Sequence, residues 1–162
     1  MFTPLAQNYG DMEVALDVDP TKTAGQCFGS ATGQYMDVCL KFDTRTLTGY
    51  ALRIIRTPKY AKAVDFQLMR YDNGKTTPLG EAVSATCYRT GCHIKVSLHG
   101  DKLEASVTTD TPLPQPDDPA LLTQVHLSAK VAPSLHGGFC LQHTGSCGES
   151  TTMLHHLSIK WE

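Results

Sequence analysis

Pairs of carboxylates are the first chemistry to consider, because two of them about 5 Å apart can hydrolyse a glycosidic bond as nucleophile and acid/base. The chain has five glutamates, and no two of them stand at alternate positions of one expected strand. Glu13 and Asp17 share a strand face, but their spacing along it is about 13 Å. We therefore expect no catalytic residue here and interpret these carboxylates as a solvated strand face.

Histidines gather in the last third of the chain. No His-x-His or His-Glu-x-x-His pattern occurs, and His155 and His156 must point to opposite faces of a strand. The segment Gly-Ser-Cys-Gly at 145–148 lacks the Gly-x-Ser-x-Gly elbow of a serine hydrolase. The sequence therefore predicts no histidine metal site, and His143 meeting His155 around a metal or a substrate proton is the less favoured alternative.

Groups that could bind a sugar are more evident. Apolar sugar faces stack on aromatic rings, and sugar hydroxyls need planar polar groups in fixed geometry. Arg53, Gln67 and Gln142 stand at alternate positions opposite the expected core. Arg53 is the anchor that we would choose, because its planar fork can hold two hydroxyls or a sugar carboxylate, and a surface ion pair with a residue such as Asp65 is the favoured alternative. The flanking candidates are Tyr50, Arg70, Tyr71 and His143.

A structural calcium ion is the one cofactor that we consider. Asp11, Asp17 and Asp19 lie close together near the N-terminus and could contribute carboxylates. No EF-hand loop is present. The favoured alternative is that these are turn residues whose side chains hydrogen-bond the local backbone.

Six cysteines suggest disulfide bonds if the protein matures in an oxidising compartment. Cys87 and Cys92 enclose four residues, including Gly91, that could close a hairpin and set the two sulfurs opposite each other. This spacing predicts a Cys87–Cys92 disulfide. A four-cysteine zinc site is disfavoured, because the two-residue spacings typical of such sites are missing.

The elements that must position these residues have the period of strands. Asp72-Asn73-Gly74 predicts a tight hairpin, since Asn and Gly accept positive φ, and His99-Gly100-Asp101 predicts another. Alternation places Phe42 and Trp161 inward at the ends of their strands. About ten short strands without a helix predict an all-β fold, a two-sheet antiparallel β-sandwich of jelly-roll type. The clearest alternation covers 13–18, 35–42, 50–56, 64–69, 93–98, 103–107, 125–131, 139–143 and 157–161.

Bulk properties narrow the classes of function. A chain of 162 residues suits a single domain spanning 1–162. The net charge of -2 comes from scattered charges without a basic stripe, so nucleic acid is not an expected partner. Apolar runs of only a few residues exclude a membrane-spanning helix. A domain excised from a longer exported protein would have these properties.

Several segments together resemble the concanavalin A-like lectin/glucanase superfamily, and in particular accessory domains of polysaccharide-degrading proteins from gut-type Bacteroidetes. They are GQCFGSATGQYMDVCLKF (25–42), LTGYALRI (47–54), FQLMRYDNG (66–74), GDKLEASV (100–107), GGFCLQHTG (137–145) and LHHLSIKW (154–161).

The resemblance implies a periplasmic, cell-surface or secreted location and glycan contact on the concave sheet. It favours a non-catalytic carbohydrate-binding or accessory domain, whose partner is a glycan or a neighbouring catalytic domain. Two alternatives stay open: a glycoside hydrolase or polysaccharide lyase of this fold, and a spacer or protein-interaction domain.

Overall fold

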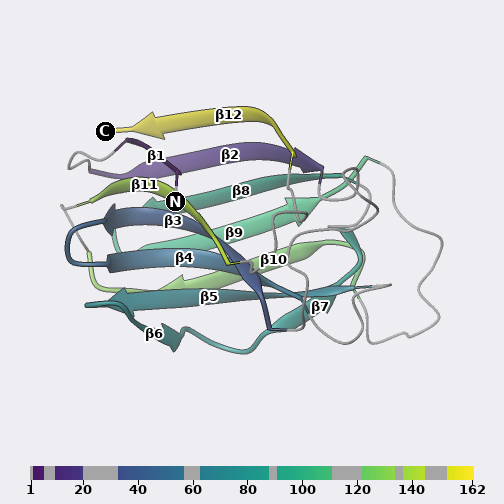
Figure 1. Cartoon of the computed structure of the whole chain (residues 1–162), viewed down its shortest axis with the longest axis horizontal. Helices are drawn as coiled ribbons and strands as arrows, with labels where there is room; N and C mark the ends of the chain where they lie inside the picture. The colour runs from purple at the N-terminus through teal and green to yellow at the C-terminus, as the bar shows by residue number, and fades with distance from the viewer. Residues whose placement is uncertain are drawn as a thin grey trace.

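The computed structural model describes residues 2–5, 10–19, 33–56, 63–87, 91–110, 122–133, 137–144 and 153–162, with the side chains of 2–5, Asp19 and Met153 left aside. These residues form two antiparallel sheets packed face to face (Figure 1). The predicted all-β, two-sheet antiparallel sandwich is confirmed. No helix in the described ranges is long and apolar enough to cross a membrane.

The sheets differ in size. The seven-stranded sheet runs in the order β1 (Phe2–Leu5), β11 (Gly138–His143), β3 (Tyr35–Asp43), β4 (Thr48–Ile55), β5 (Val64–Asp72) and β6 (Lys75–Pro78), and β7 (Val83–Ala85) also pairs with β5. The five-stranded sheet runs in the order β10 (Val125–Lys130), β9 (Lys102–Thr108), β8 (Cys92–His99), β2 (Met12–Asp19) and β12 (Met153–Trp161).

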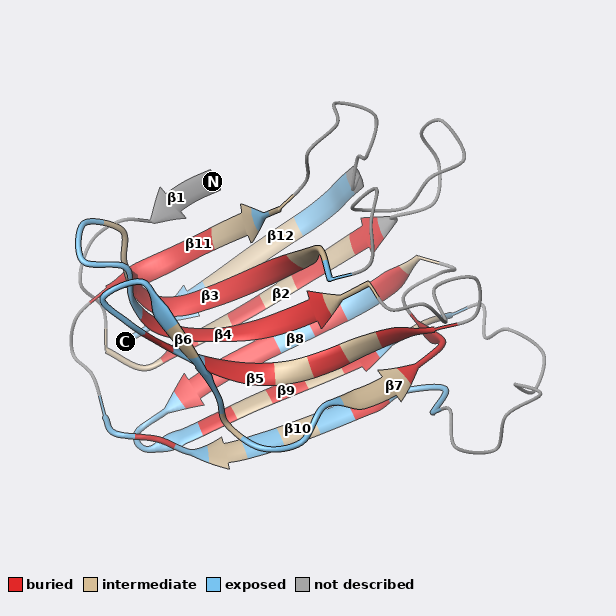
Figure 2. Ribbon diagram, turned by 60° about the horizontal axis from the view of Figure 1, so that its bottom comes forward, coloured by how far each residue is buried: buried red, intermediate tan, exposed pale blue. Residues whose placement is uncertain are grey.

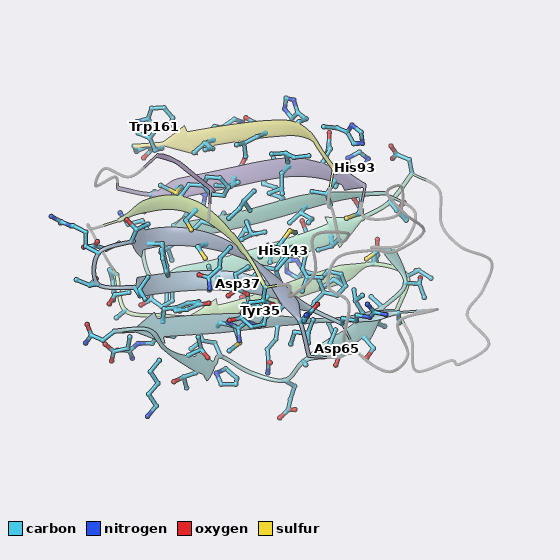
Figure 3. The ribbon with its side chains drawn as sticks, viewed as in Figure 1. Tyr35, Asp37, Asp65, His93, His143 and Trp161 are labelled. Carbon is cyan, nitrogen blue, oxygen red and sulfur yellow. The ribbon has the colours of Figure 1, made fainter. Side chains whose placement is uncertain are left out.

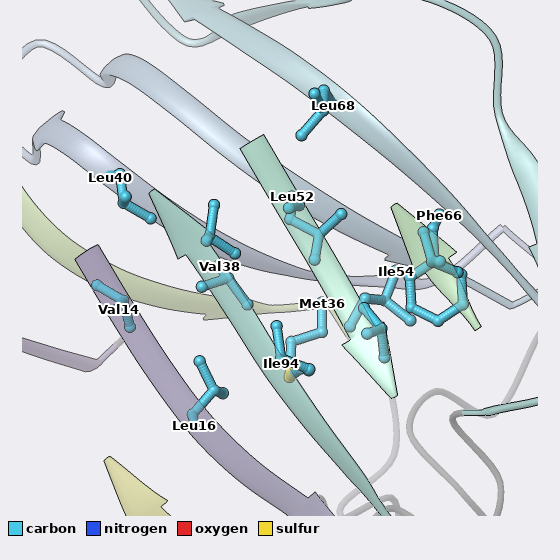
Figure 4. Close-up of a cluster of buried hydrophobic side chains, with 14 of the residues drawn as sticks. Val14, Leu16, Met36, Val38, Leu40, Leu52, Ile54, Phe66, Leu68 and Ile94 are labelled. Atoms are coloured by element: carbon cyan, nitrogen blue, oxygen red, sulfur yellow. The ribbon is translucent and has the colours of Figure 1, made fainter. Parts of the chain in front are cut away.

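The main core lies between the two sheets. Figure 4 shows Val14 and Leu16 of β2 and Ile94 of β8 in this core with residues of β3, β4 and β5. Along β8 and β9 buried and exposed or half-buried residues largely alternate, as period-2 strands require when one face meets water (Figure 2). The predicted inward sets of these strands are therefore correct.

β3 and β4 behave differently, because both of their faces are buried (Figure 2). Their inward residues join the main core. Their other residues lie on the face of the seven-stranded sheet that points away from the five-stranded sheet, which we call the outer face. A second buried cluster occupies it: Cys39, Phe42, Ala51, Met69, Tyr71 and Cys140.

A bulge at Lys41 explains the one wrong inward assignment on β3. Lys41 has φ 52, and the pairing of β3 shifts register at this point with both β4 and β11. The extra residue places Phe42 in the outer cluster, where its ring meets Tyr71 edge-on at 5.1 Å between centroids. The prediction that Phe42 points inward is therefore corrected.

The predicted hairpins are present, but the predicted core position of Trp161 is wrong. Asn73 (φ 49) and Gly74 (φ 81) make the turn between β5 and β6, and Gly100 (φ 58) turns β8 into β9. Trp161 is 49% exposed, because β12 is an edge strand of its sheet and ends there (Figure 3). The Pro-rich segment 111–119 lies outside the described residues.

Candidate functional site

Three predicted binding residues lie in one row across the outer face. Antiparallel pairing puts Gln142 of β11 beside Asp37 of β3, Asp37 beside Arg53 of β4, and Arg53 beside Gln67 of β5. Direct cross-strand partners share a face, so all four side chains stand on the outer face. The sequence analysis identified every member of this polar row except Asp37.

Arg53 is bound within the row. Its Nε and Nη2 donate to the two oxygens of Asp37 at 2.9 and 2.8 Å, and Nη2 also donates to the Tyr71 hydroxyl at 2.9 Å. Its guanidinium lies 3.6 Å from the centre of the ring of Tyr35. Figure 3 labels Tyr35 and Asp37. The Arg53 side chain is 10% exposed and that of Asp37 is fully buried. The geometry makes Arg53 the centre of a buried network rather than an open anchor.

The neighbouring groups complete this network. Tyr71 donates its own hydroxyl to Asp37, and burial together with that bond raises the pKa of Tyr71. The alternative partner Asp65 accepts a hydrogen bond from Ser84 instead. At the edge of the row Gln67 donates to the Gly80 carbonyl at 2.9 Å. The row thus ties β3, β4 and β5 together through polar contacts.

Three of the other predicted residues, Tyr50, Arg70 and Tyr71, line a hollow of about 300 Å³ beside the turn from β3 to β4, which we call the turn hollow. Tyr50 and Arg70 are direct partners on β4 and β5, and Tyr71 is the partner of Gly49. The Tyr50 hydroxyl donates to the Ala132 carbonyl at 2.9 Å, which holds the ring in place. The hollow is lined by Lys41, Asp43, Thr46, Thr48, Gly49, Tyr50, Arg70 and Tyr71.

Charged groups at the turn hollow are of both signs. Asp43 accepts the Arg45 N–H at 2.8 Å, and this hydrogen bond holds the pKa of Asp43 below its ordinary value. Arg70 is 55% exposed and lies 3.7 Å from Asp72, a distance too long to fix it. Lys41 is 2% exposed, its Nζ has no hydrogen-bond partner within the described part of the chain, and burial lowers its pKa. The hollow therefore offers an ionised carboxylate and a loosely held guanidinium.

A second hollow of about 280 Å³ lies on the exposed face of the five-stranded sheet, and the sequence analysis missed it. Its charged groups are already paired: Lys95 meets Glu13 at 2.9 Å, and Glu104 meets Lys102, which does not line the hollow, at 2.8 Å. Among the described residues that line it there is no Phe, Tyr or Trp, although His99 and His126 do line it. We call it the sheet hollow. The only sequence signal for it is that polar residues alternate along β8 and β9 and therefore share the exposed face of the sheet.

His143 and the N-terminal aspartates lie elsewhere. His143 ends β11 and is exposed (Figure 3). His155 is on β12 of the other sheet. Asp11 accepts the Gly100 N–H at 2.8 Å, and Asp17 contacts His93 at 2.6 Å. Within the described ranges no three potential metal-ligating side chains converge. The calcium site stays a prediction.

The predicted disulfide between Cys87 and Cys92 is not formed in the structure, where both residues are buried thiols. The hairpin premise was wrong: Cys87 follows β7 of the seven-stranded sheet, and Cys92 begins β8 of the five-stranded sheet. The intervening segment therefore joins two sheets rather than two hairpin strands, and both residues contribute to the main core.

Comparison with known proteins identifies the fold alone. No protein-family model and no curated protein matches the chain. The carbohydrate-binding module CBM66 from Bacillus subtilis is similar in structure, with a TM-score of 0.57 at 14% identity, covering 97% of this chain and 78% of that one. A Saccharomyces cerevisiae protein described as functionally unknown is similar with a TM-score of 0.59 at 11% identity, covering 98% of this chain and 74% of that one.

A homodimeric agglutinin from chicken liver, CG-16, is similar at a TM-score of 0.51 and 9% identity, covering 98% of this chain and 97% of that one. Identities this low show shared architecture and no more. The chain therefore has the two-sheet sandwich fold that is found in a carbohydrate-binding module and in an agglutinin.

Proposed function

We propose that this chain is a non-catalytic carbohydrate-binding β-sandwich domain and that the turn hollow holds one sugar unit. The observation that carries the proposal is the composition of this hollow: two tyrosines, two threonine hydroxyls, an ionised Asp43 and the exposed Arg70 around about 300 Å³. That volume is at the lower end of small-molecule sites, which measure about 300–1,000 Å³.

Each group has a role in such a site. Tyr50 and Tyr71 border the hollow from opposite faces of the seven-stranded sheet, Tyr50 in the main core and Tyr71 in the outer cluster, and each contributes a rigid apolar surface. Thr46 can donate to and accept from a sugar hydroxyl. The Thr48 hydroxyl already donates to the Thr46 carbonyl at 3.4 Å and accepts the Asn73 N–H at 3.2 Å, so it retains one lone pair for a sugar hydroxyl. Asp43 accepts two hydroxyl hydrogens when ionised, and Arg70 donates through its fork. Because Tyr50 and Tyr71 are already held by hydrogen bonds, little ordering entropy is lost on binding.

The same composition argues against hydrolysis. Retaining and inverting glycoside hydrolases both use a pair of Asp or Glu residues, one on each side of the glycosidic bond. Asp43 is the only carboxylate among the described residues that line the turn hollow.

The wider setting is part of the proposal. The carbohydrate-binding module and the agglutinin among the structural neighbours support a glycan as ligand. We further propose that the domain serves an exported glycan-processing protein of the Bacteroidetes type, at the cell surface, in the periplasm or outside the cell, beside a catalytic domain.

Affinity electrophoresis against a panel of soluble polysaccharides tests the proposal. We expect at least one polysaccharide to retard the domain, with no new reducing ends, and Arg70→Ala or Thr48→Val to weaken the retardation several-fold. Because the Arg70 side chain is 55% exposed, its removal should leave the melting temperature nearly unchanged.

Lys95→Ala, in the sheet hollow, is the matched control and should bind normally. If Lys95→Ala loses binding while Arg70→Ala keeps it, the sugar site is the sheet hollow. Release of reducing ends or unsaturated products would show an enzyme, and no retardation by any glycan would leave a spacer or protein-interaction domain.

A further inference from the structure

Two cysteines on neighbouring strands of the seven-stranded sheet are direct partners. Cys39 of β3 pairs with Cys140 of β11, so both side chains stand on the outer face, and both residues have no exposed surface. Direct partners in an antiparallel pair have Cα atoms about 4.5–5.5 Å apart. Disulfides bridge Cα distances of about 4.4–6.8 Å, so the pair needs no movement of the backbone.

We propose that Cys39 and Cys140 form a structural disulfide when the chain folds in the presence of a low-molecular-weight disulfide such as oxidised glutathione. Ala51 and Met69 follow the two cysteines in the same row of the outer cluster. This apolar surrounding offers the sulfurs no other polar partner within the row, and it shields a bond once formed from reducing thiols.

In the folded chain the two sulfurs differ in acidity. They share a hydrogen bond that lowers the pKa of Cys140 and raises that of Cys39, so Cys140 is the more readily ionised of the two. A thiolate is the attacking species in thiol–disulfide exchange.

In the first step the thiolate of one of the two cysteines, for example Cys140, attacks one sulfur of the small disulfide, forms a mixed disulfide and releases one small thiolate. Cys39 then loses its proton and attacks the Cys140 sulfur, which forms the protein disulfide and releases the second small thiolate. Two protein thiols are oxidised and one small disulfide is reduced to two thiols.

Burial determines when this happens. With no exposed surface on either cysteine, a small disulfide reaches the sulfurs before the sheet closes or during its opening. The loop that the bond closes is about 100 residues long, so the unfolded chain loses much conformational entropy. We therefore expect the oxidised protein to melt about 10 °C above the reduced protein.

The test is to refold the purified protein in a buffer of reduced and oxidised glutathione, alkylate the remaining thiols and digest it with chymotrypsin without reduction. Cleavage after Tyr35 and after Leu141 separates Cys39 from Cys27 and Cys140 from Cys147. Mass spectrometry should find the peptide of Cys39 linked to that of Cys140. Protein isolated without refolding and treated with diamide provides a second route to the same readout.

Cys39→Ser and Cys140→Ala should each abolish the linked peptide and the rise in melting temperature, whereas Cys87→Ala, the control, should keep both. Alkylation of Cys39 and Cys140 in protein that was oxidised and then unfolded would overturn the proposal. Linkage of either residue to a different cysteine would overturn it too.

Discussion

Arg53 and Asp37 face each other across β4 and β3, with the guanidinium Nε and Nη2 on the two carboxylate oxygens at 2.9 and 2.8 Å. A bidentate pair of this kind is strong, but both charges have left water to make it. Tyr35 stacks on the guanidinium and Tyr71 bonds both partners, so the pair is enclosed on several sides. Its removal should therefore affect folding before it affects binding.

Arg53→Ala should lower the free energy of unfolding by about 3–5 kcal/mol, because it leaves the buried Asp37 carboxylate without its cation. Urea unfolding at neutral pH measures the change. Arg45→Ala is the control: Arg45 is 89% exposed at 3.5 Å from Asp43, so its loss should change stability by less than about 1 kcal/mol. An unfolding midpoint of Arg53→Ala equal to that of the wild type would show that the pair contributes nothing.

Gly137→Ala should be severely destabilising. Gly137 has φ +88, and a Cβ there would lie 2.4 Å from the carbonyl carbon and 2.5 Å from the oxygen of Lys41. The atoms that the Cβ would meet belong to the backbone, which cannot move aside as the end of a flexible side chain can. We therefore expect the free energy of unfolding to fall by at least about 3 kcal/mol. Gly100→Ala separates strain from collision, because Gly100 has φ +58 with open space around it, and it should cost only about 1–2 kcal/mol. Equal losses in the two variants, measured by thermal unfolding, would rule out the close contact at Lys41.

His93 should make stability depend on pH. Its Nδ1 lies 2.6 Å from Asp17 and its Nε2 lies 2.8 Å from Asp110, so both nitrogens donate only when the ring is protonated. The hydrogen bond to Asp17, followed by that to Asp110, raises the pKa of His93. Because the pKa of His93 is raised in the folded state, the stability that its protonated ring contributes is fully present below the pKa of the unfolded chain, about 6.5. This stability is lost as the pH rises through the pKa of the folded state.

His93→Gln should remove that part of the pH dependence between about pH 6 and 8, as melting temperatures across this range would show. The neighbour of Asp17 on β12 is His156, so His156→Gln is the matched variant and should retain most of the dependence. Identical pH profiles for wild type and His93→Gln would contradict the assignment.

Trp161 should report on the exposed end of β12. It is the sole tryptophan of the chain and is 49% exposed, so native fluorescence should be red-shifted and readily quenched by acrylamide. Trp161→Ala should lower the unfolding free energy by about 1–3 kcal/mol, since about half of this large side chain is removed from water at about 25 cal/mol per Å². Blue-shifted, protected emission would place the ring in an apolar site instead.

Alternation predicted the strands well where only one face is buried, as in β2, β8 and β9. It also predicted the inward residues of β3 and β4 up to the bulge, but it gave no sign that a second cluster buries the outer face of these two strands as well. Phe42 was misplaced for a local reason: a lysine at positive φ carries no sequence signal for a bulge.

The candidate site could be predicted in part. Tyr50, Arg70 and Tyr71 were chosen for their chemistry, and strand pairing brings them to one hollow. Lys41 and Asp43 were not, because the bulge and the turn decide where they lie. Asp37 was missed because its importance depends on facing Arg53, which no single strand reveals.

The two-sided burial of β3 and β4 has a consequence for how these strands find each other. When both faces of a strand pack against apolar clusters, a shift of one residue in its pairing moves one set of apolar side chains to the place of the other. Hydrophobic burial alone therefore discriminates poorly between the correct register and a shifted one. A shift of one residue would, however, move Arg53 and Asp37 to opposite faces of the sheet and leave both charges buried without a partner. The Arg53–Asp37 pair thus specifies the register of β3 and β4 chiefly because it destabilises every alignment that is shifted by one residue.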